Sequence, residues 1–182
     1  DGTDDLDEMG ICIEPFSEAL GPHEFEQAIY RTAAEREGKI DARSMKGDLD
    51  LTVYSLKKWT RLALQGNPTV ILLLFLPPEM CSTRVSIGGI IQEMTPMFVS
   101  RECGKRFLGY LQHQRQRMTG ERGQKDVKRP ELVAKYGYDT KYAMHVIRLG
   151  LQGIELMTTG RLSLPMTEPN RSYVRAIRSG AI

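Results

Sequence analysis

Residues 48–54 (DLDLTVY) constrain the fold of this chain more than any other segment. Apolar and polar residues alternate along them, which predicts a strand with one apolar face. Asp48 and Asp50 lie together on the opposite face. Ser55 follows directly and is a favourable N-cap for a helix over residues 56–65. We therefore expect a strand with an acidic face that leads without a long loop into a helix.

The other expected elements divide the chain into a strand-rich first third and a helical remainder. Residues 33–47 are polar and charged, which indicates a loop. This distribution predicts the α+β (mixed α/β) class, with a small mixed β-sheet followed by a helical C-terminal half. We assign residues 1–80 to the core and residues 81–182 to a helical part that packs on it. Further strands are expected at 8–14, 25–32 and 161–164, and further helices at 68–75, 85–94, 100–118, 138–157 and 170–178.

The charge balance and the cysteines narrow the class of protein. Twenty-five Lys and Arg residues face 23 Asp and Glu residues, so the net charge of +2 indicates neither a histone-like nor an acidic protein. Cys12, Cys81 and Cys103 are too widely spaced for a CxxC zinc motif or a disulfide framework. The longest apolar run, residues 70–76, is shorter than the ~20 residues that span a bilayer, and no signal peptide is recognisable. We therefore expect a cytoplasmic protein without a membrane partner.

Three aspartates form the most informative group of side chains. Asp5 and Asp7 flank Leu6, and residues i and i+2 of an extended chain point the same way. Asp50 can join them if its strand lies beside theirs. Three close carboxylates repel one another unless a cation neutralises them, and Mg²⁺ prefers such oxygen ligands. The alternative is that the acidic terminus is only solvated and that Asp48 and Asp50 decorate an exposed sheet face.

A carboxylate site of this kind can support in-line phosphoryl or nucleotidyl transfer with two metal ions. One ion activates the attacking hydroxyl group, and the other holds the triphosphate and stabilises the leaving pyrophosphate. We assign to Asp50 the ligation of the first ion and a part in taking the proton from the nucleophile. Two Mg²⁺ ions are expected, with Mn²⁺ as the alternative.

Three segments of the chain carry a family resemblance. They are TDDLDEMGICIEP at 3–15, DLDLTVYSLKKWTRLALQGNPTVILLLF at 48–75 and YDTKYAMHVIRLGLQGIELM at 138–157. Together and in this order, they resemble the predicted nucleotidyltransferases of the DNA polymerase beta superfamily found in bacteria and their phages. The resemblance covers most of the chain between residues 3 and 165.

This resemblance implies a nucleotidyltransferase fold with its core in residues 1–80, and magnesium-dependent transfer of a nucleoside monophosphate from a nucleoside triphosphate. It also implies metal binding by Asp5, Asp7 and Asp50. Asp48 competes for the third position because it lies on the same strand face as Asp50. We prefer Asp50 because it directly precedes the LTVYSLKKW segment, as the family's acidic residue does.

The chain departs from the superfamily pattern at its start. Members carry a Gly-Ser turn several residues before the two aspartates, and its backbone amides and hydroxyl group bind the phosphates. Only residues 1–4 precede Asp5 here. Either residues upstream supply the turn and the core is N-terminally incomplete, or the chain cannot hold a triphosphate in the usual way.

The expected helix at 138–157 presents a cationic stripe. Lys141, His145 and Arg148 are spaced i, i+4 and i+7, so they share one face. Such a stripe opposite a carboxylate–metal centre can hold the triphosphate or the acceptor. The alternative is a helix held to the sheet by ion pairs, with His145 as a structural residue.

A second basic region covers the helix at 100–118 and the Gly-rich loop after it. Arg106 in this helix is a candidate phosphate ligand, for a nucleic-acid acceptor or for the nucleotide itself. The alternative is a solvated helix face followed by a mobile loop. The region comprises Arg101, Lys105, Arg106, Arg115, Arg117, Arg122, Lys125, Lys128 and Arg129.

These observations leave two principal functions open. The first is an enzyme that transfers a nucleoside monophosphate to a hydroxyl group on a nucleic acid, a protein or a small molecule. The second is a catalytically inactive nucleotidyltransferase-fold module that binds nucleic acid or a protein partner through the basic helix. A nucleotide hydrolase that uses the same metal ions is a third alternative.

Overall fold

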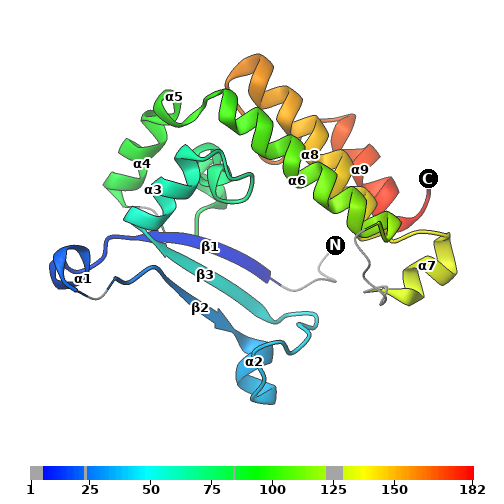
Figure 1. Cartoon of the computed structure of the whole chain (residues 1–182), viewed down its shortest axis with the longest axis horizontal. Coiled ribbons are helices and arrows are strands. Elements are labelled where there is room, and N and C mark those ends of the chain that lie inside the picture. Colours follow the sequence, from blue (N-terminus) through cyan, green and yellow to red (C-terminus); the bar gives the residue numbers. More distant parts are fainter. Residues whose placement is uncertain (1–5, 23, 84, 122–128) are drawn as a thin grey trace. The chain divides into compact units, whose positions relative to one another are not determined.

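The computed structural model describes residues 6–22, 24–83, 85–121 and 129–182. The chain divides into two compact units, Asp1–Leu62 and Ala63–Ile182. The first unit contains the β-sheet, and the second is built from helices (Figure 1). The α+β class predicted from the order of the elements is therefore confirmed.

Three strands in the described residues form one mixed sheet in the order β1-β3-β2 (Figure 1). The outer strand β1 (Leu6–Cys12) is parallel to the central strand β3 (Leu49–Ser55). The other outer strand, β2 (Gln27–Arg31), is antiparallel to β3. The predicted strand with an acidic face is thus the middle strand, where its side chains have neighbours on both sides.

Short helices follow the strands of the first unit. α1 (Phe16–Leu20) comes after β1, and α2 (Thr32–Glu37) continues directly from β2. The prediction of a loop over residues 33–47 is therefore wrong for its first part. The buried Ala33 anchors α2, and the Thr32 hydroxyl group accepts a hydrogen bond from the backbone N–H of Leu49, 3.1 Å away.

The predicted step from β3 into a helix is confirmed. α3 (Leu56–Leu64) begins directly after Ser55, whose hydroxyl group accepts a hydrogen bond from the backbone N–H of Lys58 at 3.1 Å. This bond satisfies one of the four backbone donors that a helix leaves free at its N-terminus. Trp59 and Ala63 on this helix are fully buried.

The second unit begins with an apolar segment that forms 3-10 helix instead of the expected α-helix. This helix begins at Val70 with Thr69 as its N-cap residue, so the prediction of Asn67 as the N-cap and Pro68 as the first helical residue is wrong. The Asn67 side-chain oxygen nevertheless accepts from the backbone N–H of Thr69 at 2.9 Å, in the turn before the helix. The Gln92 amide donates to the carbonyl oxygens of Leu73 (3.1 Å) and Leu76 (2.9 Å). In a longer α-helix, backbone N–H groups of the same helix would donate to these oxygens. The elements here are η1 (Val70–Phe75), η2 (Pro78–Met80), α4 (Ser86–Glu93) and α5 (Thr95–Phe98).

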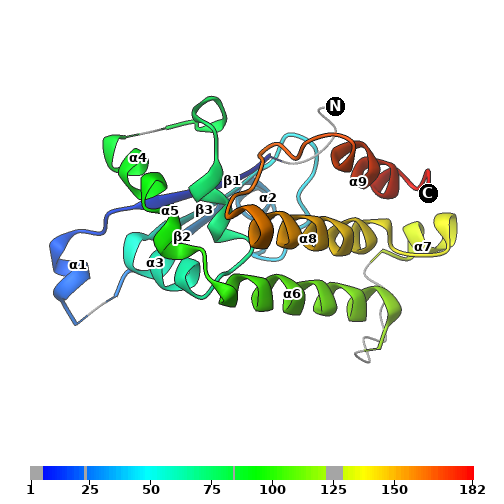
Figure 2. The ribbon, with the colours of Figure 1, turned by 90° about the horizontal axis from the view of Figure 1, so that it is seen from above.

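Longer helices make up the rest of the second unit, and α6 and α8 lie side by side in both views (Figures 1 and 2). Gly153 permits their close approach, because a Cβ atom at this position would lie 3.2 Å from the Cβ of Phe107. α8 begins at the predicted place, where the Asp139 carboxylate accepts from the backbone N–H of Lys141 at 3.0 Å. These helices are α6 (Arg101–Thr119), α7 (Pro130–Tyr136), α8 (Thr140–Thr159) and α9 (Asn170–Ser179).

The short strand expected at 161–164 is absent, and that prediction is wrong. The Glu155 carboxylate accepts hydrogen bonds from the backbone N–H and the hydroxyl group of Ser163, at 3.0 and 2.6 Å. These bonds hold the segment against the end of α8, so its backbone is not free to pair with a strand. Among the helices that the structure describes, none has both the length and the apolar character needed to cross a lipid bilayer.

Candidate functional site

Asp7 and Asp50 are register partners in the parallel pair of strands β1 and β3. Neighbouring strands lie roughly 4.8 Å apart, and register partners present their side chains to the same face of the sheet. The carboxylates of Asp7 and Asp50 therefore lie next to each other on one face of the sheet, near the first residues of both strands. The sequence analysis expected Asp50 to join Asp7 only if their strands are neighbours. In the sheet, β1 and β3 are neighbours.

The Asp50 carboxylate is held in position by Ser44 and Arg31. The Ser44 hydroxyl group lies 3.0 and 2.9 Å from its two oxygens, and the Arg31 Nε lies 3.2 Å from Oδ1. Arg31 is the register partner of Asp50 on β2, and its guanidinium group also donates to the backbone oxygens of Ile40 (2.8 Å) and Ala42 (3.0 Å). The loop before β3 thus fixes the orientation of the carboxylate.

Asp48 is engaged in a different way. Its carboxylate receives two hydrogen bonds from the Arg36 guanidinium group, at 2.6 and 3.0 Å, and one from the backbone N–H of Met45 at 2.7 Å. These hydrogen bonds, led by those from Arg36, hold the pKa of Asp48 below its usual value. Its side chain is 7% exposed, against 22% for Asp50. Asp48 therefore ties α2 to the start of β3 and offers few free oxygen positions to a ligand.

The donor chemistry at the Asp7–Asp50 pair suits a magnesium ion, which takes carboxylate oxygens and completes its coordination with water and phosphate oxygens. Asp5, the remaining predicted ligand, lies outside the described residues. Within the described part of the chain, no three acidic, histidine or cysteine side chains gather around one point. Asp7 and Asp50 are accordingly the two predicted metal ligands whose positions are known.

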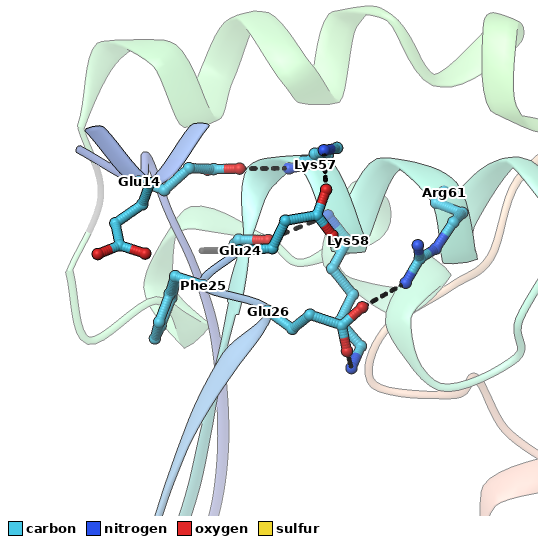
Figure 3. Close-up of a pocket in the computed structure, with 9 residues that line it drawn as sticks. Glu14, Glu24, Phe25, Glu26, Lys57, Lys58 and Arg61 are labelled. Carbon is cyan, nitrogen blue, oxygen red and sulfur yellow. Dashed lines mark hydrogen bonds and ion pairs between the residues drawn. The ribbon is translucent and has the colours of Figure 1, made fainter. Parts of the chain in front are cut away.

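The opposite end of the sheet carries a pocket of a different kind (Figure 3). Its cavity of about 10 Å³ has room for a single water molecule. Each labelled carboxylate has a partner: Glu14 accepts from the first backbone N–H groups of α3, Glu24 pairs with Lys57, and Glu26 pairs with two cations of α3. This cluster anchors α3 to the sheet and does not form a substrate site.

In the second unit, the predicted stripe of α8 lies in a strongly cationic region. Burial, and after it the charges of Arg148, Lys141, Arg129 and Arg178, together lower the pKa of His145 to about 4. The imidazole is therefore neutral at pH 7. Neither Lys141 nor Arg148 forms an ion pair with another described residue. The alternative role of these two cations, which was to hold the helix in place through ion pairs, therefore has no support among the described residues.

The basic region on α6 is partly neutralised. Arg106 is exposed and forms no ion pair with any residue that the structure describes. Arg122, Lys125 and Lys128, which also belong to the predicted region, lie outside the described residues. Ion pairs join Lys105 to Glu102 (2.6 Å), Arg115 to Glu121 (3.6 Å) and Arg129 to Asp139 (2.9 Å).

A comparison with known protein families identifies the family of this chain. A family model described as RlaP, RNA repair pathway DNA polymerase beta family, matches residues 1–178. The chain belongs to this family. No curated protein and no solved structure matches the chain.

Membership of this family confirms the resemblance drawn from the three sequence segments. The RlaP family is polymerase beta-like, so the chain belongs to a group of nucleotidyltransferases, and its small mixed sheet with a helical C-terminal half is consistent with that fold. The match extends over α9, beyond the end of the predicted resemblance at residue 165.

Sequence reasoning missed several residues that shape the carboxylate site. Ser44 lies in a segment expected to be an irregular loop, and nothing in its surroundings along the sequence connects it to Asp50. Arg31 closes the expected second strand, and a basic residue there could have been paired with the acidic face of the third. Arg36, which donates hydrogen bonds to Asp48, was not recognised because its segment was predicted to be a loop and is in fact the helix α2.

Proposed function

We propose that this chain is a magnesium-dependent nucleotidyltransferase that moves a nucleoside monophosphate from a nucleoside triphosphate to a hydroxyl group of an RNA. The observation that carries the proposal is the register pairing of Asp7 with Asp50 on one face of the sheet. The description of the RlaP family as part of an RNA repair pathway supports RNA as the acceptor. The three free cysteines support a reducing cytoplasm as the place of action.

The proposed reaction is an in-line displacement at the α-phosphorus. The acceptor hydroxyl oxygen forms a bond to this phosphorus, while the bond from phosphorus to the oxygen that bridges to the β-phosphate breaks. Pyrophosphate leaves with the electron pair, and the hydroxyl proton passes to the Asp50 carboxylate. Bound magnesium supplies the positive charge that makes the hydroxyl group more acidic and neutralises the phosphates.

Asp7 and Asp50, together with Asp5, are the proposed magnesium ligands. Ser44 and Arg31 act as positioning residues in this proposal, because the Ser44 hydrogen bonds and the Arg31 ion pair fix the plane of the Asp50 carboxylate. A carboxylate offers about four lone-pair positions, so Asp50 keeps capacity for a metal ion beside these donors. Loss of a group that hydrogen-bonds to a metal ligand typically changes metal affinity by about 10- to 100-fold.

Four residues are proposed to bind phosphates of the two substrates. Lys141 and Arg148 of α8 would attract the triphosphate as cations, and His145 would act as a neutral hydrogen-bonding partner at pH 7. Arg106, exposed on α6, would contact the backbone phosphates of the RNA. The cationic surroundings of His145 support this assignment for α8.

Calorimetric titration with ATP, GTP, CTP and UTP, with and without magnesium, tests the first step of this proposal. We expect magnesium-dependent binding of at least one triphosphate, and its loss in Asp7→Asn. Asp41→Asn makes the same chemical change at an exposed loop position and should bind normally. Absence of magnesium-dependent binding in the unaltered chain would contradict the proposal.

A transfer assay tests the second step. Triphosphates that carry a label on the α-phosphate are incubated with RNA that ends in a free 3′ hydroxyl group, and with the same RNA blocked at that end. We expect the label on the first RNA only, with release of one pyrophosphate per nucleotide transferred. Release of pyrophosphate without labelled RNA would indicate hydrolysis instead of transfer.

A catalytically inactive binding module is the second candidate, and the contact of Arg31 with Asp50 favours it. A guanidinium group at 3.2 Å from this carboxylate supplies part of the positive charge that a metal ion would otherwise provide. In this case the chain would bind RNA through its basic helix α6. Salt-sensitive RNA binding that is unchanged in Asp7→Asn, together with no triphosphate binding, would support this candidate.

A further inference from the structure

A cavity of about 270 Å³ lies between elements of the second unit and is lined by three arginines. Arg148 comes from α8, and Arg171 and Arg175 lie one turn apart on α9, which runs beside α8 (Figures 1 and 2). The buried Gln152 adds an amide group, and apolar side chains such as Leu72 form the remaining wall. The cavity therefore combines several cationic donors with a partly apolar lining.

The Arg148 guanidinium group is the strongest sign that this cavity has a ligand. Its Nε atom is buried without a hydrogen-bond partner, and Arg148 has no ion pair with any residue that the structure describes. Burial lowers the pKa of this group, but an arginine remains charged at neutral pH. Arg148 is half-buried, so part of its charged group is removed from water without a compensating partner. Such desolvation is costly, and a complementary group is therefore expected to meet this arginine when the protein works.

No carboxylate of α8, of α9 or of the segment before α9 forms an ion pair with Arg148 in the described structure. Glu155 is the single acidic residue in the sequences of α8 and α9, and its carboxylate is bound to Ser163. Glu168 lies near α9, where Ser172 and then Arg171 and Arg175 lower its pKa. It forms no ion pair with either arginine in the described structure, so the cavity keeps an excess of positive charge.

Positively charged side chains of the packed helices α8 and α9 face the same cavity. Arg148 of α8 lines the same cavity as Arg171 and Arg175 of α9. Arg178 of α9 also contributes to the lowered pKa of His145 on α8. Repulsion between cations weakens the packing of these helices unless an anion lies between them. An anion at this place would satisfy Arg148 and relieve the repulsion at the same time.

We infer that the cavity formed by Arg148, Gln152, Arg171 and Arg175 binds a phosphate group. Guanidinium groups match phosphate oxygens with two parallel hydrogen bonds, and the Gln152 amide can donate another. A volume of about 270 Å³ is just below the range of pockets that hold drug-sized ligands. It can therefore hold a phosphate group together with part of the molecule that carries it.

This inference does not rest on the carboxylate site, because it can be tested with inorganic phosphate in the absence of any metal ion. Calorimetric titration and thermal unfolding are measured at constant ionic strength, so that general screening does not change. We expect phosphate to bind and to raise the melting temperature of the unaltered chain. Arg171→Gln and Arg175→Gln should each bind phosphate at least about tenfold more weakly, since each removes charged hydrogen bonds.

Arg161→Gln is the matched control, because it makes the same chemical change at an exposed residue of the same unit that does not line the cavity. Its phosphate affinity should equal that of the unaltered chain. Arg148→Gln should also lose phosphate binding, and the α9 variants decide the question if it does not fold. Failure of phosphate to bind, or an equal loss of affinity in Arg161→Gln, would overturn the inference.

The pKa of His145, followed by nuclear magnetic resonance, gives an independent measurement. The groups around its imidazole are Arg148 and Lys141 on the same helix, Arg129 before α7, and Arg178 on α9. A bound phosphate brings negative charge into this cationic region and should raise the pKa of His145. The pKa should not change when phosphate is added to Arg171→Gln. An unchanged pKa in the unaltered chain at saturating phosphate would contradict the inference.

The phosphate can come from a nucleoside triphosphate or from the end of an RNA, and further titrations without metal distinguish these sources. The ligands are ATP, a 5′-phosphorylated RNA oligonucleotide and the same oligonucleotide with a 5′ hydroxyl group. Weaker binding of ATP by Arg171→Gln would identify the nucleotide as the source. A loss of the preference for the phosphorylated over the hydroxyl end would identify the RNA. If Arg171→Gln changes neither, the inference is wrong.

Discussion

Asp7 on β1 and Asp50 on β3 are direct neighbours across a pair of parallel strands, and their carboxylates share one face of the sheet. Asp48, two residues before Asp50, is instead bound by Arg36 and by a backbone N–H group. Two acidic residues that the alternating pattern makes equivalent thus have different surroundings.

Asp50→Asn and Asp48→Asn should separate catalysis from stability. Asp50→Asn removes a proposed metal ligand and proton acceptor, so nucleotidyl transfer should fall by about 100-fold or more while the melting temperature changes little. Asp48→Asn weakens the contact with Arg36, so it should lower the melting temperature while folded protein keeps its turnover rate. Both quantities are measured on the same preparations. Equal loss of activity in the two variants would contradict the assignment of Asp50 as the ligand.

Ser44→Ala should weaken metal binding without unfolding the protein. The Ser44 hydroxyl group donates to the Asp50 carboxylate, and its loss leaves that carboxylate less firmly oriented. We expect the magnesium concentration for half-maximal activity to rise by about tenfold, with a smaller change in kcat at saturating magnesium. Ser17→Ala, at an exposed position of α1, serves as the control. A fall in kcat that excess magnesium does not reduce would argue against a positioning role.

The free energy of unfolding should depend on pH through His145. Its pKa is about 4 in the folded chain, below the ordinary value of 6.5, so the unfolded chain takes up the proton first as the pH falls. The folded state should therefore lose stability between pH 6.5 and pH 4, and this contribution should level off below pH 4. The upper limit is about 3 kcal/mol, and solvent screening reduces it because the imidazole is only half-buried.

Urea unfolding of His145→Gln at several pH values measures this contribution. The difference in unfolding free energy between the variant and the unaltered chain isolates His145 from the carboxylates that titrate in the same range. The unaltered chain should lose more stability than the variant as the pH falls from 6.5 to 4. Parallel curves for the two proteins would show that His145 titrates normally.

Two glycine substitutions in the second unit should have opposite effects. Gly66 has a φ of +71°, and a Cβ atom there would lie 2.5 Å from the Cα of Cys103. Gly66→Ala should therefore lower the free energy of unfolding by about 3 kcal/mol. Gly109 lies within α6 with open space around its Cα, so Gly109→Ala should raise stability by about 0.5–1 kcal/mol. Thermal unfolding of both variants checks the sign and size of these changes.

Local patterns were sufficient for the secondary structure where a cap or a strict period was present. The strand at 48–54, the Ser55 cap and the helices at 100–118 and 138–157 were all predicted close to their observed positions. Two of the wrong predictions concern segments whose backbone groups are satisfied by distant side chains. The Glu155 carboxylate accepts from the backbone N–H of Ser163, and the Gln92 amide donates to the carbonyl oxygens of Leu73 and Leu76.

The sequence by itself determined that the chain has a small sheet followed by helices, and it identified Asp7 and Asp50 as candidate metal ligands. Strand and helix periodicity, capping residues and the family motifs depend on neighbours along the chain, so they can be recognised without a structure. The confirmed family membership agrees with these local signals.

The family motif favoured Asp50 over Asp48, but only the tertiary structure showed how their surroundings differ, because Arg36, Ser44 and Arg31 reach the two carboxylates from other parts of the chain. Only packing brought Arg171 and Arg175 to the cavity that contains Arg148. Desolvation and the pairing of charges depend on distances through space, and the spacing of residues along the chain does not specify those distances.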